Sequence, residues 1–204
     1  MSTTNKPTRP PGPHNSAVCQ PRAGGFGRLV GHAILRVMGW RLVGEFPSCP
    51  KYVIALAPHT SNWDLALGMG SLWSRGMRIS WMMKREAFIW PLGPLWRALG
   101  GIPIDRRNAG DVTAQAVRWF DSRRSAVLAI TPEGTRRAVP HYRKGYLRIA
   151  RGAGVPILIA GIDSRNKTIL LDRLWHVGED LDADNMAIRD YVRANFRGVR
   201  PSRD

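Results

Sequence analysis

A histidine and an aspartate separated by four residues are the first side chains whose types and spacing suggest chemistry. His59 and Asp64 bound the segment HTSNWD, which directly follows an apolar run at 51–57. A carboxylate next to one imidazole nitrogen fixes the tautomer of the ring, so the other nitrogen can take a proton from an alcohol. The pair therefore favours a general base oriented by a carboxylate, with a substrate hydroxyl as the nucleophile.

The spacing sets a condition on the backbone. In one continuous helix, five positions turn through about 500°, which leaves the two side chains roughly 140° apart. His59 and Asp64 can meet only if the histidine lies in a turn and the aspartate lies in the first turn of the following helix. Ser61 or Asn62 can cap such a helix, and its dipole favours an acidic residue there. The alternative interpretation is a capping aspartate beside a buried histidine that is bonded to backbone.

A second polar segment, TPEGTRR, occurs at the end of the apolar run at 126–131. Its proline and glycine favour a tight turn that would present Glu133, Thr135 and Arg136 together. A guanidinium group is a planar fork that suits phosphate, so Arg136 is a candidate for binding a phosphorylated substrate. The alternative is a surface turn with solvated arginines.

Two further segments place positive charge after short apolar runs. GGIPIDRR at 100–107 ends in a basic pair, and Lys84 follows the apolar run at 78–83. Lys84 could add a positive charge to the same pocket. By itself, GGIPIDRR is also typical of an ordinary strand followed by a basic turn.

The elements around these groups predict a single-domain α/β fold. A chain of 204 residues is long enough for one substantial core, and apolar runs alternate with helical patterns. Strands are expected at 51–57, 78–83, within 100–106, and at 126–131, 155–162 and 167–171; helices are expected at 65–73, 91–99, 111–122, 144–153 and 184–196. Several polar segments thus lie where a strand ends, which is where open α/β sheets bind ligands.

The N-terminal region divides into two parts. Residues 1–22 are rich in Pro, Thr and Asn and predict a disordered tail, without the apolar stretch of a secretory signal. Residues 23–40 mix apolar side chains with Arg28, His32 and Arg36, a pattern typical of an interfacial amphipathic helix. The alternative is a helix that covers the core. No uninterrupted apolar run reaches eighteen residues, so a simple transmembrane span is not expected.

The charge balance indicates an anionic partner. Lys and Arg number 31 against 15 Asp and Glu, a net charge of +16 that would attract nucleic acid, acidic lipid headgroups or a phosphorylated substrate. No helix-turn-helix, zinc-finger or RRM pattern accompanies it, so nucleic acid is not the expected partner. The two cysteines are too few for a disulfide framework or a thiolate metal site.

In chain order, four segments resemble the glycerolipid acyltransferase family that includes 1-acylglycerol-3-phosphate acyltransferases. HTSNWD is similar to its H-x4-D block, GGIPIDRR to its glycine–arginine block, TPEGTRR to its E-G-T-R block, and VPILIA at 155–160 to its apolar block with a proline. The resemblance covers about residues 40–165. It implies a glycerophosphate-acyltransferase-like fold, a mixed sheet flanked by helices, with residues 41–204 as the acyltransferase domain.

The resemblance also implies a role for each site residue. His59 would be the general base and Asp64 its partner, with no metal or other cofactor. The acceptor would be bound by side chains and backbone of the later blocks: Lys84, Arg106, Glu133, Gly134, Thr135 and Arg136. Pro156 would shape the acyl or acceptor pocket. Backbone N–H groups of the turn near residue 60 are candidates for stabilising the oxyanion.

The implied reaction moves a fatty acyl group from acyl-CoA or acyl-carrier protein to a lysophospholipid. It would occur at the cytoplasmic face of an anionic membrane, with the enzyme bound as a peripheral or monotopic protein. Pro58 before the histidine, and Arg137 where the family often has serine, depart from the family pattern. These departures leave open another acceptor, a lyso-aminolipid or a glycolipid. A serine hydrolase is disfavoured because no serine has the G-x-S-x-G context.

Overall fold

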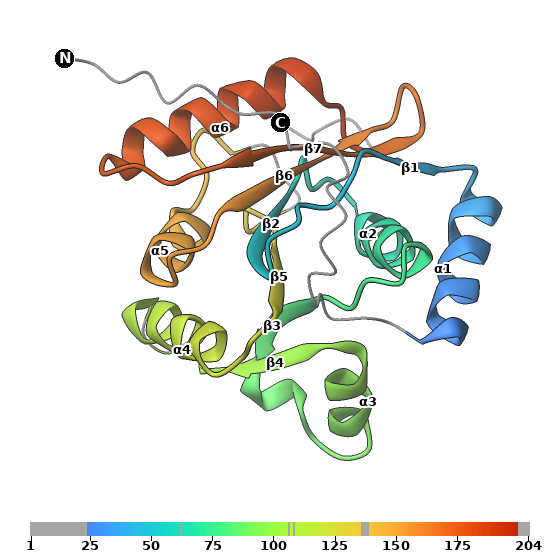
Figure 1. Ribbon diagram of the computed structural model, residues 1–204, viewed down its shortest axis with the longest axis horizontal. Helices are drawn as coiled ribbons and strands as arrows, with labels where there is room; N and C mark the ends of the chain where they lie inside the picture. Colours follow the sequence, from blue (N-terminus) through green and yellow to red (C-terminus); the bar gives the residue numbers. More distant parts are fainter. Residues whose placement is uncertain (1–23, 62, 106, 108, 136–138, 200–204) are drawn as a thin grey trace.

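Apolar runs form a mixed sheet, and amphipathic segments cover both of its faces (Figure 1). The computed structural model describes residues 24–199 except 62, 106, 108 and 136–138. Within these residues the sheet has seven strands in the order β1-β7-β6-β2-β5-β3-β4. The strands are β1 (Arg41–Val43), β2 (Lys51–Ala57), β3 (Ser80–Lys84), β4 (Gly101–Ile104), β5 (Ala126–Ile130), β6 (Ile157–Asp163) and β7 (Thr168–Trp175).

Strand direction brings the polar segments to one edge of the sheet. Strands β2 to β6 are mutually parallel, whereas β7 is antiparallel to β6, and β1 is parallel to β7. The carboxyl ends of β2, β3, β4 and β5 therefore lie at the same edge, as expected for a ligand site in an α/β sheet.

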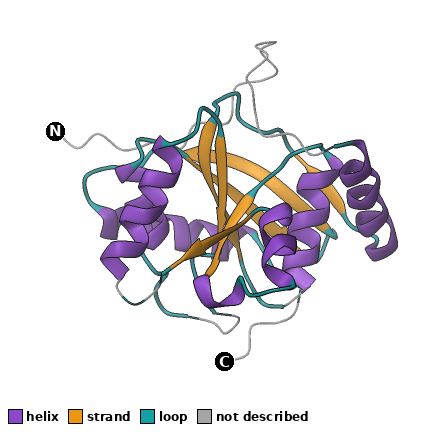
Figure 2. Cartoon of the chain, turned by 90° about the horizontal axis from the view of Figure 1, so that it is seen from below, coloured by secondary structure: helices purple, strands orange, loops and turns teal. Residues whose placement is uncertain are grey.

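Helices flank the twisted sheet on both sides, as seen from below in Figure 2. α4 (Ala109–Asp121), α5 (Gly145–Gly152) and α6 (Leu181–Asn195) pack on one face, and α2 (Trp63–Ser74) packs on the other, with α1 (Gly25–Met38) outside it. The short η1 (Arg85–Ala87) and α3 (Leu92–Leu99) adjoin β4. The central strands β2 and β6 are almost wholly buried, as parallel strands covered on both faces must be.

The expected α/β architecture is confirmed. Each strand and helix expected beyond residue 50 is present, with ends within four residues of the expected positions. β1 was not anticipated, because three residues are too few to show a period, and β7 continues to Trp175 beyond its expected end at 171. The expected tail, residues 1–22, lies outside the described residues.

Helix α1 packs mainly on α2, and its Leu35 joins a small apolar cluster with Leu67 of α2 and Ile169 of β7. A Cβ added at Gly31 would lie 2.3 Å from the Ser74 backbone nitrogen, so the two helices approach as closely as their backbones allow. Gly31 and Leu35 are the buried residues of α1, whereas Phe26, Leu29 and Val37 are 81%, 68% and 88% exposed. Among the described residues, no helix is long and apolar enough to cross a membrane.

This packing predicts that Gly31→Ala destabilises the fold. Because the added methyl group would meet α2 backbone rather than a flexible side chain, we expect a loss of about 1–3 kcal/mol in the free energy of unfolding, measured by urea denaturation. Gly25→Ala in the same helix is the matched control, since its Cβ would meet nothing within 4 Å. Equal stability of the two variants would contradict the close packing.

Candidate active site

The loop between β2 and α2 holds His59 against Asp64. His59 lies two residues after the end of β2, and Asp64 lies in the first turn of α2. His59 Nδ1 is 3.0 Å from Asp64 Oδ2, with the histidine side chain 20% exposed and the aspartate side chain fully buried. The distance is that of an ion pair, although the alignment falls short of a hydrogen bond and Nδ1 has no other partner among the described residues. Such contacts commonly tighten only when substrate is bound.

A capping box explains why this sequence folds in this way. The Asp64 carboxylate accepts hydrogen bonds from the backbone N–H groups of Thr60 (2.6 Å) and Ser61 (2.7 Å), all through Oδ2. In return, the Ser61 hydroxyl accepts from the Trp63 N–H at 3.3 Å. The Ser61 hydroxyl thus satisfies one of the first N–H groups of α2, and the aspartate three residues later satisfies N–H groups of the loop before the helix. The capping aspartate and the partner of the histidine are the same residue.

These hydrogen bonds correct the expectation that backbone N–H groups of the turn near residue 60 stabilise an oxyanion. The N–H groups of Thr60 and Ser61 donate to Asp64, and the N–H of His59 donates to Glu133 Oε2 at 2.5 Å. The turn near residue 60 therefore has no free N–H among these three to aim at a developing negative charge. Stabilisation of an oxyanion must come from other groups.

Glu133 holds the histidine loop from the neighbouring strand. It follows β5 in the turn closed by the Gly134 N–H to Thr131 carbonyl bond (3.1 Å), and it is 8% exposed. Burial raises the pKa of Glu133 to about 7, partly opposed by the hydrogen bond from the His59 N–H. The nearby Asp64 carboxylate raises the pKa further, while His59 and Arg193 lower it. Glu133 thus contacts the backbone of His59 and does not line the cavity described below.

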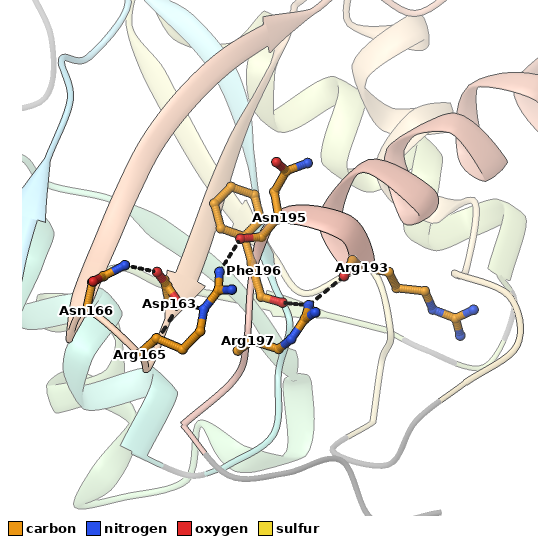
Figure 3. Close-up of polar contacts among 7 residues, drawn as sticks. All are labelled: Asp163, Arg165, Asn166, Arg193, Asn195, Phe196 and Arg197. Carbon is orange, nitrogen blue, oxygen red and sulfur yellow. Dashed lines mark hydrogen bonds and ion pairs between the residues drawn. The ribbon is translucent and has the colours of Figure 1, made fainter.

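The segment after α6 supports the same loop from another side. A Cβ at Gly198 would lie 2.3 Å from Thr60 Cγ2, so a glycine here lets the two segments touch. The segment is fixed by backbone pairing with the end of β6. Asp163 and Arg197 form an isolated parallel β-bridge, and the Arg197 carbonyl accepts a hydrogen bond from the Ser164 N–H at 2.9 Å. Arg165 joins Asp163 to the Asn195 carbonyl in the same network (Figure 3).

A cavity of about 940 Å³ adjoins the pair. Its polar wall includes His59, Asp64, Gly134 and Thr135. Much of its remaining wall is apolar and comes from α2 and the sheet face beneath it, including Ile54, Leu56, Met69, Leu72, Ile79 and Trp81. The histidine–aspartate pair, a polar rim and an apolar interior therefore share one space. Among the described residues, no cluster of three or more His, Cys, Asp or Glu could hold a metal ion.

The remaining expected site residues are not all brought to this cavity. Lys84 is exposed at the end of β3 and is not part of the wall. Pro156 precedes β6 and its carbonyl accepts from Val53 N–H, which places it at the opposite edge of the sheet from His59, about 20 Å away at 3.3 Å per strand residue. Arg106 and Arg136 lie outside the described residues.

Three basic residues that the motifs did not single out do line the cavity. Arg143, Lys144 and Arg148 come from the segment HYRKGYLR at the start of α5. Their only sequence signal was a group of cations after TPEGTRR, which is equally typical of a solvated surface.

Comparison with known proteins agrees with the family resemblance of the four motif segments. Residues 45–162 match the profile of the Acyltransferase family, a match that covers more than half of the chain and includes all four motif segments. The chain belongs to this family. The family expectation is thereby confirmed, and the protein is an acyltransferase enzyme.

The fold of this acyltransferase is similar to a solved structure. It matches the crystal structure of the 1-acyl-sn-glycerophosphate (LPA) acyltransferase PlsC from Thermotoga maritima with a TM-score of 0.60 and 18% identity. The match covers 83% of this chain and 76% of that chain, and at this identity it establishes the fold alone. No curated protein matches the sequence.

The raised pKa of Glu133 predicts a pH-dependent effect of Glu133→Gln on stability. The folded state binds the Glu133 proton more tightly than the unfolded state does. The stability that Glu133 contributes through this proton is therefore complete below about pH 4.5 and is lost as the pH rises through about 7. Relative to wild type, the glutamine variant should therefore gain up to about 3 kcal/mol in unfolding free energy between pH 4.5 and 8.

Urea denaturation at the two pH values measures this gain. Glu86→Gln, on the exposed turn η1, controls for removal of a surface carboxyl. A stability difference between Glu133→Gln and wild type that does not vary with pH would show that Glu133 titrates as an exposed residue.

Proposed function

We propose that this acyltransferase moves a fatty acyl group from acyl-CoA or acyl-carrier protein to the hydroxyl of a lysophospholipid such as 1-acylglycerol-3-phosphate. The observation that carries the proposal is the pairing of His59 with Asp64 on the wall of a cavity that also has an apolar interior. This class of acceptor is also supported by the shared fold with PlsC, which is a 1-acyl-sn-glycerophosphate acyltransferase.

The reaction uses the imidazole nitrogen that faces away from Asp64. His59 Nε2 takes the proton from the acceptor hydroxyl as its oxygen attacks the thioester carbonyl, forming a tetrahedral intermediate. The intermediate collapses with loss of the thiolate, which receives the proton from Nε2. Asp64 keeps Nδ1 protonated throughout and stabilises the imidazolium. No step requires a metal ion or a second cofactor.

The apolar wall suits the fatty acyl chain. Burial of a chain between α2 and the sheet removes methylene groups from water at about 0.8 kcal/mol each. Because chain burial contributes binding energy remote from the reacting carbon, it can hold the thioester beside His59. A lyso-aminolipid or a glycolipid acceptor would use the same base and the same chain pocket, and the assay below separates these acceptors.

The proposal also locates the enzyme at the cytoplasmic face of an anionic membrane, through the interfacial helix expected at 23–40. Phe26, Leu29 and Val37 project from α1 into solvent, and Arg28 and Arg36 lie in the same helix. Apolar side chains of this kind can enter the headgroup boundary while arginines contact anionic lipids.

His59→Ala is expected to reduce acyl transfer by about 100-fold to 10,000-fold without unfolding the protein, because a general base typically contributes 10²–10⁴-fold. His141→Ala is the matched control, since that exposed histidine is not on the cavity wall. The assay uses labelled acyl-CoA or acyl-carrier protein with a panel of lysolipids and detects products by mass spectrometry. Wild-type turnover in the His59 variant would overturn the mechanism, and acylation of a non-phosphorylated acceptor alone would overturn the acceptor.

Combined substitution of Phe26, Leu29 and Val37 by serine is expected to weaken vesicle binding tenfold or more, because three apolar side chains no longer enter the lipid. Co-sedimentation with vesicles of phosphatidylglycerol, compared with phosphatidylcholine, measures the loss. Met186→Ser removes an apolar side chain that is 51% exposed on α6 and serves as control. Unchanged binding of the triple variant would exclude α1 as the anchor.

A further inference from the structure

The start of α5 presents positive charge to the cavity that contains His59. Arg143 and Arg148 line this cavity together with Lys144, and both arginines are exposed to solvent. Lys144 is paired with Asp182. In the described part of the chain, neither arginine has a carboxylate partner. Two uncompensated guanidinium groups therefore share the cavity with the reactive pair.

This segment is held firmly in place. The Arg143 N–H donates to the Pro132 carbonyl at 2.9 Å, which ties it to the turn that carries Glu133 and Gly134. From the other side, buried Asn185 of α6 accepts from the Tyr146 hydroxyl at 3.1 Å and donates to the Tyr142 carbonyl at 2.8 Å. Anchored on both sides, the segment has a fixed position relative to the histidine loop.

Arg143 also contacts the same turn through its side chain, which lies close to Gly134. Gly134 has a φ of +64°, and a Cβ there would lie 2.9 Å from Arg143 Cδ and Nε. The arginine stem therefore packs over the glycine backbone, and its guanidinium group extends along the wall on which Gly134 and Thr135 lie. The first turn of α5 contains no acidic residue and no side-chain cap, so the helix end adds to the positive potential.

We infer that Arg143 and Arg148 bind a phosphate group of a substrate and determine specificity for phosphorylated substrates. The inference rests on the function proposed above. Guanidinium groups bind phosphate through paired, charge-assisted hydrogen bonds, and two of them can compensate the double charge of a phosphate monoester. Both the phosphate of a lysophospholipid acceptor and the phosphates of a CoA donor have this chemistry. Held at this wall, the phosphate fixes one end of the substrate while its reacting atom lies at His59.

Steady-state kinetics of Arg143→Ala and Arg148→Ala test the inference. Each variant is expected to raise KM for one phosphorylated substrate by about 10-fold to 100-fold, with kcat changed less than threefold, because binding of that substrate is weakened. Arg148→Lys should retain part of the affinity that Arg148→Ala loses, since lysine keeps the positive charge but lacks the paired N–H donors of the guanidinium group. Arg151→Ala is the matched control on the same helix, because Arg151 bonds to the Glu179 carbonyl and is not on the wall.

Two arms identify the source of the phosphate. One compares 1-acylglycerol-3-phosphate with monoacylglycerol as acceptor, and the other compares acyl-CoA with acyl-pantetheine as donor. A KM effect confined to the phosphorylated member of either pair supports the inference and assigns the phosphate to that substrate. Equal effects on both members of each pair, or kinetics like those of Arg151→Ala, would overturn it.

A binding measurement separates this inference from the proposed function. Inorganic phosphate and CoA are each titrated against wild type, Arg151→Ala and the double variant Arg143→Ala/Arg148→Ala, with the thermal midpoint as readout. A midpoint that rises in the first two proteins but not in the double variant supports an arginine phosphate site even if no lysolipid is acylated. The same rise in all three proteins, with the variants folded by circular dichroism, would eliminate the site.

Discussion

The buried carboxylate of Asp64 is the group on which the active site depends. Removing a carboxylate from water is costly unless donors surround it, and the Thr60 and Ser61 N–H groups donate to its Oδ2, with His59 Nδ1 at 3.0 Å from the same oxygen. Oδ1 is buried and has no hydrogen-bond partner among the described residues. The same bonds join the loop to the first turn of α2 and hold the conformation that brings the imidazole to the carboxylate. The start of α2 therefore helps to maintain the geometry of the His59–Asp64 pair.

The loop that contains His59 is also restrained from two distant parts of the sequence. Glu133, at the end of β5, accepts the His59 N–H, and Gly198, beyond α6, allows close contact with Thr60. Because β5 is the neighbour of β2 in the sheet, strand order alone brings the glutamate to the histidine. Preorganisation by rigid elements lets a base act without reorganising at each turnover, which is the main protein contribution to such reactions.

Local patterns in the sequence predicted the contacts that form within a few residues and missed those formed by tertiary packing. The capping of α2 and the approach of His59 to Asp64 followed from spacing, because both occur in one loop. Glu133 was expected to bind the acceptor; the structure shows it accepting the His59 N–H, a contact that forms only once β5 pairs with β2. Pro156 resembled part of a family block, yet it immediately precedes β6 at the edge of the sheet opposite His59. The group of cations that includes Arg143 did not indicate a site by itself, because the position of Arg143 over Gly134 depends on α6 fixing the start of α5.

The net charge of +16 has different consequences at different distances. Ions screen surface charges beyond about 8 Å at physiological ionic strength, so scattered arginines can contribute to attraction toward an anionic surface but not to recognition of one group. Recognition requires charges that converge on a partly enclosed space, as Arg143 and Arg148 do. The raised pKa of Glu133 complements this arrangement, since burial leaves the carboxyl protonated in a large share of molecules near pH 7. Negative charge near Asp64 is thereby reduced, and the arginines on the wall of the cavity favour an anion while its interior favours a hydrocarbon chain.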